Sequence, residues 1–432
     1  MSVRRICSPL RTVTFSRRSF LRATGFAALA AGAHGQTAEA LPPVRAITRG
    51  PKFHWFGYYD KLQFDSTNRL VLGNEVDFEH RSPTADDRIK VGMVDLADGD
   101  KWIELGETQA WNWQQGCMLQ WLPGSENEVM WNDREGDHFV CHILNVKSGK
   151  KRTLPNPVYT VSPDGRWGLA PDFRRLNDCR PGYGYAGIPD PNKDALAPGS
   201  AGIWKIDMQT GEAKLIITLA QVAAIPWEAE GGYGANAKNW FNHLLFNQDG
   251  SRFIFLHRWR AEGEPISTFH TRMFTAAADG SDLFVIDPSG FSSHFVWRDP
   301  AHVFLFTYHP SAKMRFYLFK DKTREVTPIG PDLMTVNGHN TYLPGTNNEW
   351  VLNDTYPDKA NLQHPFLYHI PTDRRLPLGH FESKPPYRGE WRCDTHPRSS
   401  RDGRLVCIDS PHGAGRQMYL IDLRELPGGP WK

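Results

Sequence analysis

The sequence predicts an all-β protein, a seven-bladed β-propeller closed by an N-terminal strand, and three observations lead to this prediction. Aromatic residues, glycine and proline are abundant (15 Trp, 24 Phe, 38 Gly and 32 Pro), while long stretches of helical periodicity are nearly absent. A short hairpin recurs along the chain. Each copy is followed by further strand-like segments around polar turns, a pattern that is typical of closed repeat folds.

The repeating unit is an apolar strand, a tight turn and a second apolar strand. Its clearest copies span 158–169, 243–256 and 396–408, each with an Asp-Gly turn, and weaker copies begin at Lys61, Met118, His294 and His339. Second hairpins follow at 90–105, 139–154, 203–217, 273–286, 315–329 and 366–378, but the last copy has only the strand 417–422. We therefore expect residues 44–49 to complete the last blade and to cover its edge.

Residues 1–40 are predicted to be a twin-arginine signal peptide. Arg17 and Arg18 precede an apolar run over 23–33, and Ala38-Glu39-Ala40 offers a small-x-small cleavage pattern. The apolar run is shorter than the roughly 20 residues of a bilayer span, so no stable membrane span is expected. The prediction is export to the periplasm or the medium, with one propeller domain over 41–432. A long loop insertion is expected near 174–235, and such loops are often functional.

The net charge bears on a nucleic-acid partner, and the cysteine spacing bears on zinc sites and disulfides. Without residues 1–40 the chain has 44 basic and 47 acidic side chains, a net charge of −3 (44 − 47), so no nucleic-acid partner is indicated. Five cysteines remain without C-x-x-C spacing, which argues against a zinc knuckle or a disulfide framework and leaves one disulfide open. We expect a monomer or a small homo-oligomer.

Four successive repeats carry histidine at the start of the inner strand. These residues are His243, His294, His339 and His396. Inner strands converge on the axis of a propeller, so the imidazoles are expected to form a metal or catalytic cluster; the alternative is a purely structural ring of hydrogen-bonded histidines. Imidazole ligands alone suit Zn, Mn or Fe and leave the identity of the metal open, whereas added carboxylate or carbonyl oxygens, such as those of Asp394, would favour Mn or Ca.

Aromatic and amide side chains are expected on the same face as the histidines. The candidate substrate-binding residues are His54, Tyr58, Tyr59, Trp113, Gln115, Tyr183, Asp354 and Tyr356. Aromatic planes beside polar groups suit sugar rings, which present apolar C–H faces and hydroxyl edges. Ordinary packing of the blades is the alternative explanation for each aromatic residue taken singly.

Short segments of the second half carry a family resemblance. They are Asn242-His243 with Asn247, Ser293-His294, Gly338-His339-Asn340 with Asn353-Asp354-Thr355, and the run 393–403. Over residues 235–425 the chain resembles the oligogalacturonate lyases, seven-bladed propellers that cleave uronate-containing oligosaccharides by β-elimination. Two departures stand out: the H-x-H of the family reads Asp394-Thr395-His396, and its upstream Gln ligand position falls on Trp391.

The resemblance implies a lyase that acts on an acidic oligosaccharide, which with the signal peptide would be exported; propeller lyases acting on ulvan or rhamnose–glucuronate linkages are alternative relatives, so the particular uronate stays open. His243 would be the general base, and a divalent metal ion (Mn, Zn or Ca) would be held by His294, His339, Asp394 and His396. Removal of the C5 proton of a uronate requires neutralisation of the adjacent carboxylate, which a cation or an arginine can supply. The guanidinium groups of Arg258 and Arg180 are candidates for pairing with that carboxylate.

Other functions remain open at this point. A non-catalytic exported propeller that binds a glycan or a protein partner is the main alternative. A glycoside hydrolase would need a pair of carboxylates, for which Asp354 and Asp409 are candidates. A peptidase is disfavoured because the sequence has no G-x-S-x-G motif.

Overall fold

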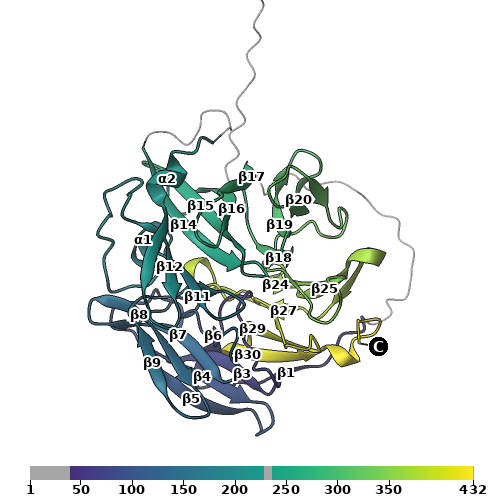
Figure 1. The fold of residues 1–432 in the computed structure, drawn as a ribbon. Helices are drawn as coiled ribbons and strands as arrows, with labels where there is room; N and C mark the ends of the chain where they lie inside the picture. Colours follow the sequence, from purple (N-terminus) through teal and green to yellow (C-terminus); the bar gives the residue numbers. More distant parts are fainter. Residues whose placement is uncertain (1–38, 228–235, 432) are drawn as a thin grey trace, which may run out of the picture. The chain divides into compact units, whose positions relative to one another are not determined.

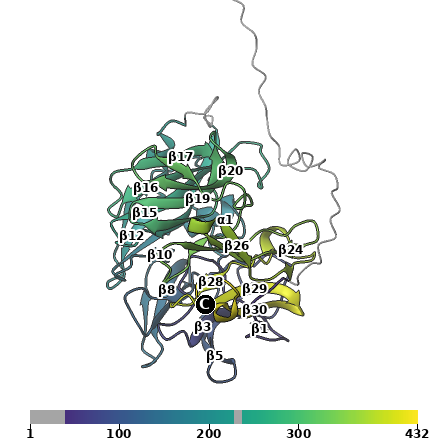
Figure 2. The same cartoon turned by 90° about the vertical axis from the view of Figure 1, so that its right-hand side faces the viewer.

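A computed structural model describes residues 39–227 and 236–431, so the predicted signal peptide lies outside the described residues except for its last two positions. Within the unit Leu41–Lys432, seven four-stranded sheets follow one another as the blades of a β-propeller (Figures 1 and 2). The predicted seven-bladed fold is confirmed.

Each blade runs from an inner to an outer strand, mostly in chain order. Blade one holds β2 (Phe53–Trp55), β3 (Leu70–Val76), β4 (Ile89–Asp95) and β5 (Lys101–Thr108), and blade two holds β6 (Gln120–Trp121), β7 (Glu128–Glu135), β8 (His138–Asn145) and β9 (Lys151–Leu154). Blade three holds β10 (Thr160–Val161), β11 (Trp167–Pro171), β12 (Gly202–Asp207) and β13 (Ala213–Thr218), and blade four holds β14 (Ala237–Phe246), β15 (Arg252–Ala261), β16 (His270–Ala277) and β17 (Phe284–Gly290).

The remaining blades follow the same plan. Blade five holds β18 (Phe295–Asp299), β19 (His302–His309), β20 (Lys313–Lys320) and β21 (Val326–Pro328), and blade six holds β22 (Thr341–Tyr342), β23 (Trp350–Asn353), β25 (Phe366–His369) and β26 (Arg374–Pro377). Blade seven holds β28 (Arg398–Ser399), β29 (Leu405–Gly413) and β30 (Gly415–Asp422). A separate pair joins β24 (Leu362–Gln363) to β27 (Phe381–Glu382), and short 3-10 turns cover Ile370–Thr372, Gly389–Trp391 and Leu423–Glu425.

The N-terminal strand closes the propeller. Strand β1 (Val44–Ala46) pairs antiparallel with β30, with Val44 opposite Ile421 and Ala46 opposite Tyr419. It therefore supplies the fourth, outer strand of blade seven, as the incomplete last repeat predicts. The pairing leaves β30 without an unpaired edge, which favours a closed and non-aggregating molecule.

The inner strands of blades one and four depart from regular pairing near residues of the candidate site. In blade one the chain leaves the sheet after β2 and returns at the bridge between Phe64 and Val71. In blade four the register of β14 against β15 shifts between Asn242 and Leu245, and His243 in this bulge has a φ of 52°. A left-handed backbone at a non-glycine residue is uncommon and is concentrated at functional positions, and bulges re-aim side chains.

Within the predicted insertion, the described residues 174–227 contain two short helices besides the predicted hairpin. Helix α1 (Phe173–Cys179) and a loop to residue 201 separate β11 from β12, and α2 (Leu219–Ala223) follows β13. Buried Arg175 holds the loop in place: its guanidinium donates to Asp190 and to the backbone oxygens of Asn192 and Asn239, among others. The loop is thereby pinned to β14, beside His243.

The blades pack through aromatic and aliphatic side chains, and the largest buried ones include seven tryptophans. The five cysteines of the described ranges, Cys117, Cys141, Cys179, Cys393 and Cys407, are all buried free thiols, so the disulfide left open by the sequence is not formed among them. Within 39–227 and 236–431, no helix combines the length and apolar character that a membrane span requires.

Candidate functional site

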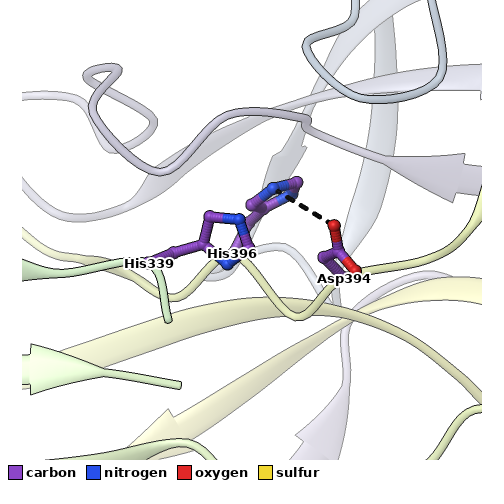
Figure 3. Close-up of side chains that lie close together, drawn as sticks. All are labelled: His339, Asp394 and His396. Carbon is purple, nitrogen blue, oxygen red and sulfur yellow. Dashed lines mark ion pairs between the residues drawn. The ribbon is translucent and has the colours of Figure 1, made fainter. Parts of the chain in front are cut away.

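The inner-strand starts of blades six and seven bring together two imidazoles and a carboxylate. His339 lies two residues before β22, and Asp394 and His396 lie just before β28. One donor atom of each residue lies within 4.8 Å of the donor atoms of the other two, and the two imidazole centroids are 4.1 Å apart. Figure 3 shows the Asp394 carboxylate facing the His396 ring with His339 beside it. All three side chains are buried.

Each of these three residues has a buried polar atom that forms no hydrogen bond within the described residues. Nε2 of His339, Nε2 of His396 and Oδ1 of Asp394 are buried and have no hydrogen-bond partner among the described residues. The His396 Nε2 to Asp394 Oδ2 separation is 3.9 Å, too long for a hydrogen bond. Buried polar atoms without a partner are costly, and a divalent cation would satisfy all three together. The residues therefore fit a metal ion.

A second carboxylate orients this group. Asp354 Oδ1 lies 3.0 Å from Nδ1 of His339 and 2.7 Å from the His339 backbone nitrogen, which donates to it. Its Oδ2 accepts from the Thr395 hydroxyl at 2.6 Å and from the His396 backbone nitrogen at 3.1 Å. With Nδ1 of His339 donating to Asp354, the lone pair on Nε2 points away from the carboxylate, as a metal ligand requires.

His294 adjoins the group without joining it. Its ring centroid is 4.1 Å from that of His339, but its Nδ1 is bonded to Asn337 Oδ1 at 2.9 Å. Its Nε2 lies 3.5 Å from the Tyr356 hydroxyl. Of the four expected metal ligands, the structure thus gathers three into one group and places the fourth next to it.

His243 occupies the neighbouring position in blade four, packed between tyrosines. The Tyr58 ring stacks on it with centroids 5.0 Å apart, and the Tyr58 hydroxyl lies 3.3 Å from Nε2. On the other side Nδ1 lies 2.9 Å from the Tyr159 hydroxyl and 3.2 Å from Gln115 Nε2. Burial, and then the nearby Arg258, hold the pKa of His243 well below its ordinary value, so the ring is neutral at pH 7.

Two buried arginines have free donors beside this histidine. Arg180, from the loop after α1, and Arg258, from β15, lie 4.4 Å and 4.8 Å from the centre of the Phe269 ring. Nε of Arg180 and Nη1 of Arg258 lack a hydrogen-bond partner in the part of the chain that is described. Burial, and then repulsion by Arg180, lower the pKa of Arg258 to about 10, which leaves it charged at pH 7. Paired guanidinium groups with free N–H donors suit a carboxylate ligand.

Tyr183 lies between Arg180 and the group formed by His339, Asp394 and His396. Its hydroxyl oxygen accepts from Nη2 of Arg392 at 2.8 Å, and Nε of Arg392 donates to Asp394 at 2.6 Å. Its ring meets the His243 ring edge-on, with centroids 5.5 Å apart. Burial acts to raise the pKa of Tyr183, but Arg392 and Arg180 outweigh it and bring the pKa below its ordinary value.

Two of the sequence-derived candidates have their polar groups engaged elsewhere. His54 is bonded at both nitrogens, to Gln417 at 3.0 Å and to Glu75 at 3.1 Å. Trp113 is buried against Trp55, and its indole nitrogen donates to a backbone oxygen. The structure therefore does not bring these two side chains into the group around His243 and His339.

The carboxylates considered for a glycoside hydrolase are also engaged. Asp409 accepts from the backbone nitrogens of Phe56 and Gly57 and forms a buried ion pair with Arg398 at 2.8 Å. Asp354 is used for orientation, as described above. Since hydrolysis needs one carboxylate as acid and another as base or nucleophile, this pair does not support it.

Sequence reasoning missed two residues of the site. Tyr159 immediately precedes β10, so it holds in blade three the inner-strand start that histidines hold in blades four to seven. Extending the repeat register to every copy would have identified it. Arg392 lies two residues before Asp394, and its approach to Tyr183 depends on a loop 209 residues away in sequence, so no local signal marks it.

Comparison with known proteins supports the fold and the resemblance. No protein-family model and no curated protein sequence matches this chain. An oligogalacturonate lyase from Vibrio parahaemolyticus is similar in structure, with a TM-score of 0.61 and 13% identity over 88% of this chain and 93% of that one. An oligogalacturonate lyase in complex with manganese gives a TM-score of 0.64 and 14% identity, over 90% of this chain and 95% of the lyase chain. The tricorn protease gives a TM-score of 0.50 and 10% identity, over 88% of this chain and 35% of the tricorn chain.

Proposed function

We propose that this protein is an exported lyase that cleaves uronate-containing oligosaccharides by metal-assisted β-elimination. The observation that carries the proposal is the close approach of His339, Asp394 and His396, each of which has a buried donor atom without a hydrogen-bond partner in the described residues. A neutral histidine and two arginines with free donors adjoin them. The likeness to structures named as oligogalacturonate lyases, one of them in complex with manganese, agrees with this combination.

The arginines suit the first requirement of the reaction, which is a neutralised uronate carboxylate. Free N–H donors on Arg180 and Arg258 would hold the carboxylate and stabilise the negative charge that develops as the C5 proton leaves. A divalent ion bound by His339, Asp394 and His396, with Mn, Zn and Ca as candidates, would supply Lewis-acid stabilisation of the same charge.

His243 is the proposed general base. Its Nδ1 lies between the Tyr159 hydroxyl and the Gln115 amide, and its Nε2 faces the Tyr58 hydroxyl. A neutral imidazole can accept the C5 proton at pH 7, and the stacked Tyr58 ring holds its plane. We propose that the substrate contacts are made by residues lining this group: Tyr58, Tyr59, Gln115, Tyr183 and Tyr356.

The test combines metal content with product formation on purified protein. We expect about one equivalent of divalent metal, and ultraviolet absorbance from an unsaturated uronate when oligogalacturonate or another uronate glycan is supplied. Chelation should abolish the signal and readdition of Mn, Zn or Ca should restore it. A His243→Ala variant that is fully active would refute the base assignment. Glycan binding without any product would instead support a non-catalytic propeller.

Export is a separate part of the proposal, supported by the twin-arginine pattern at Arg17 and Arg18. Replacement of both arginines by lysine should leave the protein in the cytoplasmic fraction of the producing cell, whereas the parent chain should appear in the periplasm or medium. Equal export of the two chains would contradict this reading of the N-terminus.

A further inference from the structure

The side chain of Tyr183 occupies a fixed place between His243 and Arg392. The flanking residues hold it there: Gly182 has a φ of 92°, and a Cβ on Gly184 would lie 2.1 Å from the Asn177 backbone nitrogen. Neither position tolerates a side chain, so the loop presses closely on α1. The Tyr183 ring is 7% exposed, and its hydroxyl points into the group of charged residues rather than to solvent.

The hydroxyl of Tyr183 accepts a hydrogen bond but donates none to the described residues. Its oxygen accepts from Arg392 at 2.8 Å, and its own O–H has no hydrogen-bond acceptor within residues 39–227 and 236–431. The other tyrosines around the site differ. Tyr59 donates to the backbone oxygen of Phe295 at 2.9 Å, and the hydroxyls of Tyr58 and Tyr159 are bonded to His243. The Tyr356 hydroxyl lies 3.5 Å from Nε2 of His294. Among the tyrosines of this site, Tyr183 is thus the one whose hydroxyl proton has no acceptor in the described residues.

The charges facing Tyr183 stabilise the anion that would form when it gives up a proton. The charged groups that act on it are Arg180, Arg392 and Asp394. The two guanidinium groups bring its pKa below the ordinary value despite burial, whereas burial raises the pKa of Tyr58 and Tyr159 well above it. Among these tyrosines, Tyr183 is therefore the one whose anion the surroundings favour, and it lies beside the neutral ring of His243.

We propose that Tyr183 is the general acid of the elimination, the residue that protonates the departing glycosidic oxygen. This rests on the proposed function. In the step, the unprotonated ring nitrogen of His243 takes the C5 proton, the C5–H electrons form the C4=C5 double bond, and the C4–O4 bond breaks. The O4 oxygen takes the hydroxyl proton of Tyr183. His243 is left as imidazolium and Tyr183 as tyrosinate, and proton exchange with water restores both, so no other reactant is consumed.

The test uses two substrates that differ only in their need for an acid. One is oligogalacturonate, whose leaving alkoxide must be protonated; the other is a galacturonoside with para-nitrophenoxide at C4, a leaving group stable as an anion. For Tyr183→Phe we expect kcat/KM on oligogalacturonate to fall by roughly 100-fold or more and to fall less than about 10-fold on the nitrophenoxide substrate. His243→Ala should lose activity on both.

Tyr185→Phe is the matched control from the same loop. Tyr185 is buried, stacks on Phe173 with centroids 4.2 Å apart and accepts from Asn132 at 2.9 Å, away from the arginines. It should keep the parent activity on both substrates. Retained nitrophenoxide activity in Tyr183→Phe also shows that the variant is folded and that its base works.

The outcomes separate the two proposals. Full oligogalacturonate activity in Tyr183→Phe, or an equal loss on both substrates, overturns the assignment of Tyr183 as acid while leaving the lyase standing. Absence of unsaturated product from either substrate with the parent protein overturns the lyase itself and the acid with it.

Discussion

His54 of blade one and His339 of blade six are both buried histidines at the start of the propeller's innermost layer, yet their hydrogen bonds differ. His54 uses both ring nitrogens, toward Gln417 and Glu75. His339 uses only Nδ1, toward Asp354, and its buried Nε2 has no partner in the described ranges. The comparison teaches that burial and position do not identify a metal ligand; an unused nitrogen facing other unused donors does.

The largest effect should come from removing that unused nitrogen. His339→Ala and His396→Ala each delete one of three converging donors, so we expect bound metal to fall below about a tenth of an equivalent and elimination activity to fall roughly 100-fold or more. Elemental analysis after dialysis measures the first and ultraviolet absorbance the second. A variant that keeps stoichiometric metal would remove its residue from the site.

A smaller effect is expected from the carboxylate that orients His339. Asp354→Asn keeps the size of the side chain but removes its charge, which should weaken metal affinity by about 10- to 100-fold. Competition with a chromophoric chelator measures this affinity. Asp287→Asn is the control, because Asp287 is a buried carboxylate bonded to the hydroxyls of Ser292 and Thr307 outside the site. An equal loss of affinity in both variants would contradict the orienting role.

The smallest effect on the site should come from the fully bonded histidine. His54→Ala leaves Glu75 and Gln417 without their partner, so we expect the free energy of unfolding to drop by roughly 1–3 kcal/mol. Metal content and metal affinity should stay at the parent values. Urea unfolding with parallel metal analysis checks both, and loss of metal in this folded variant would break the comparison between the two histidines.

The fold was predictable because its signals are local. Strand alternation and tight turns are encoded over a few residues, and their recurrence counts the blades. The missing last strand pointed to residues 44–49, and β1 pairs with β30 there. The loop between α1 and β12 was harder to interpret, because it is held by one buried arginine, Arg175, which is bonded to the backbone oxygens of Leu196 and Asn239.

The site was predictable only in outline. The repeat register predicted that His243, His294, His339 and His396 lie together; in the structure the rings of His294 and His396 each lie 4.1 Å from that of His339, and His243 packs against Tyr58. The same reasoning included His54 and Trp113, whose polar atoms are bonded elsewhere, and it missed Tyr159 and Arg392.

By itself, the sequence determined the number of blades, the closing strand and the face on which histidine gathers, because turns, alternation and repeat register are short-range properties. Only the tertiary structure decided which donor atoms remain unused and which hydroxyl keeps its proton. The partners that engage Nδ1 of His294 and of His339, namely Asn337 and Asp354, lie 43 and 15 residues away in sequence. Hydrogen-bond satisfaction in a buried site is settled by such distant neighbours, and no local pattern encodes it.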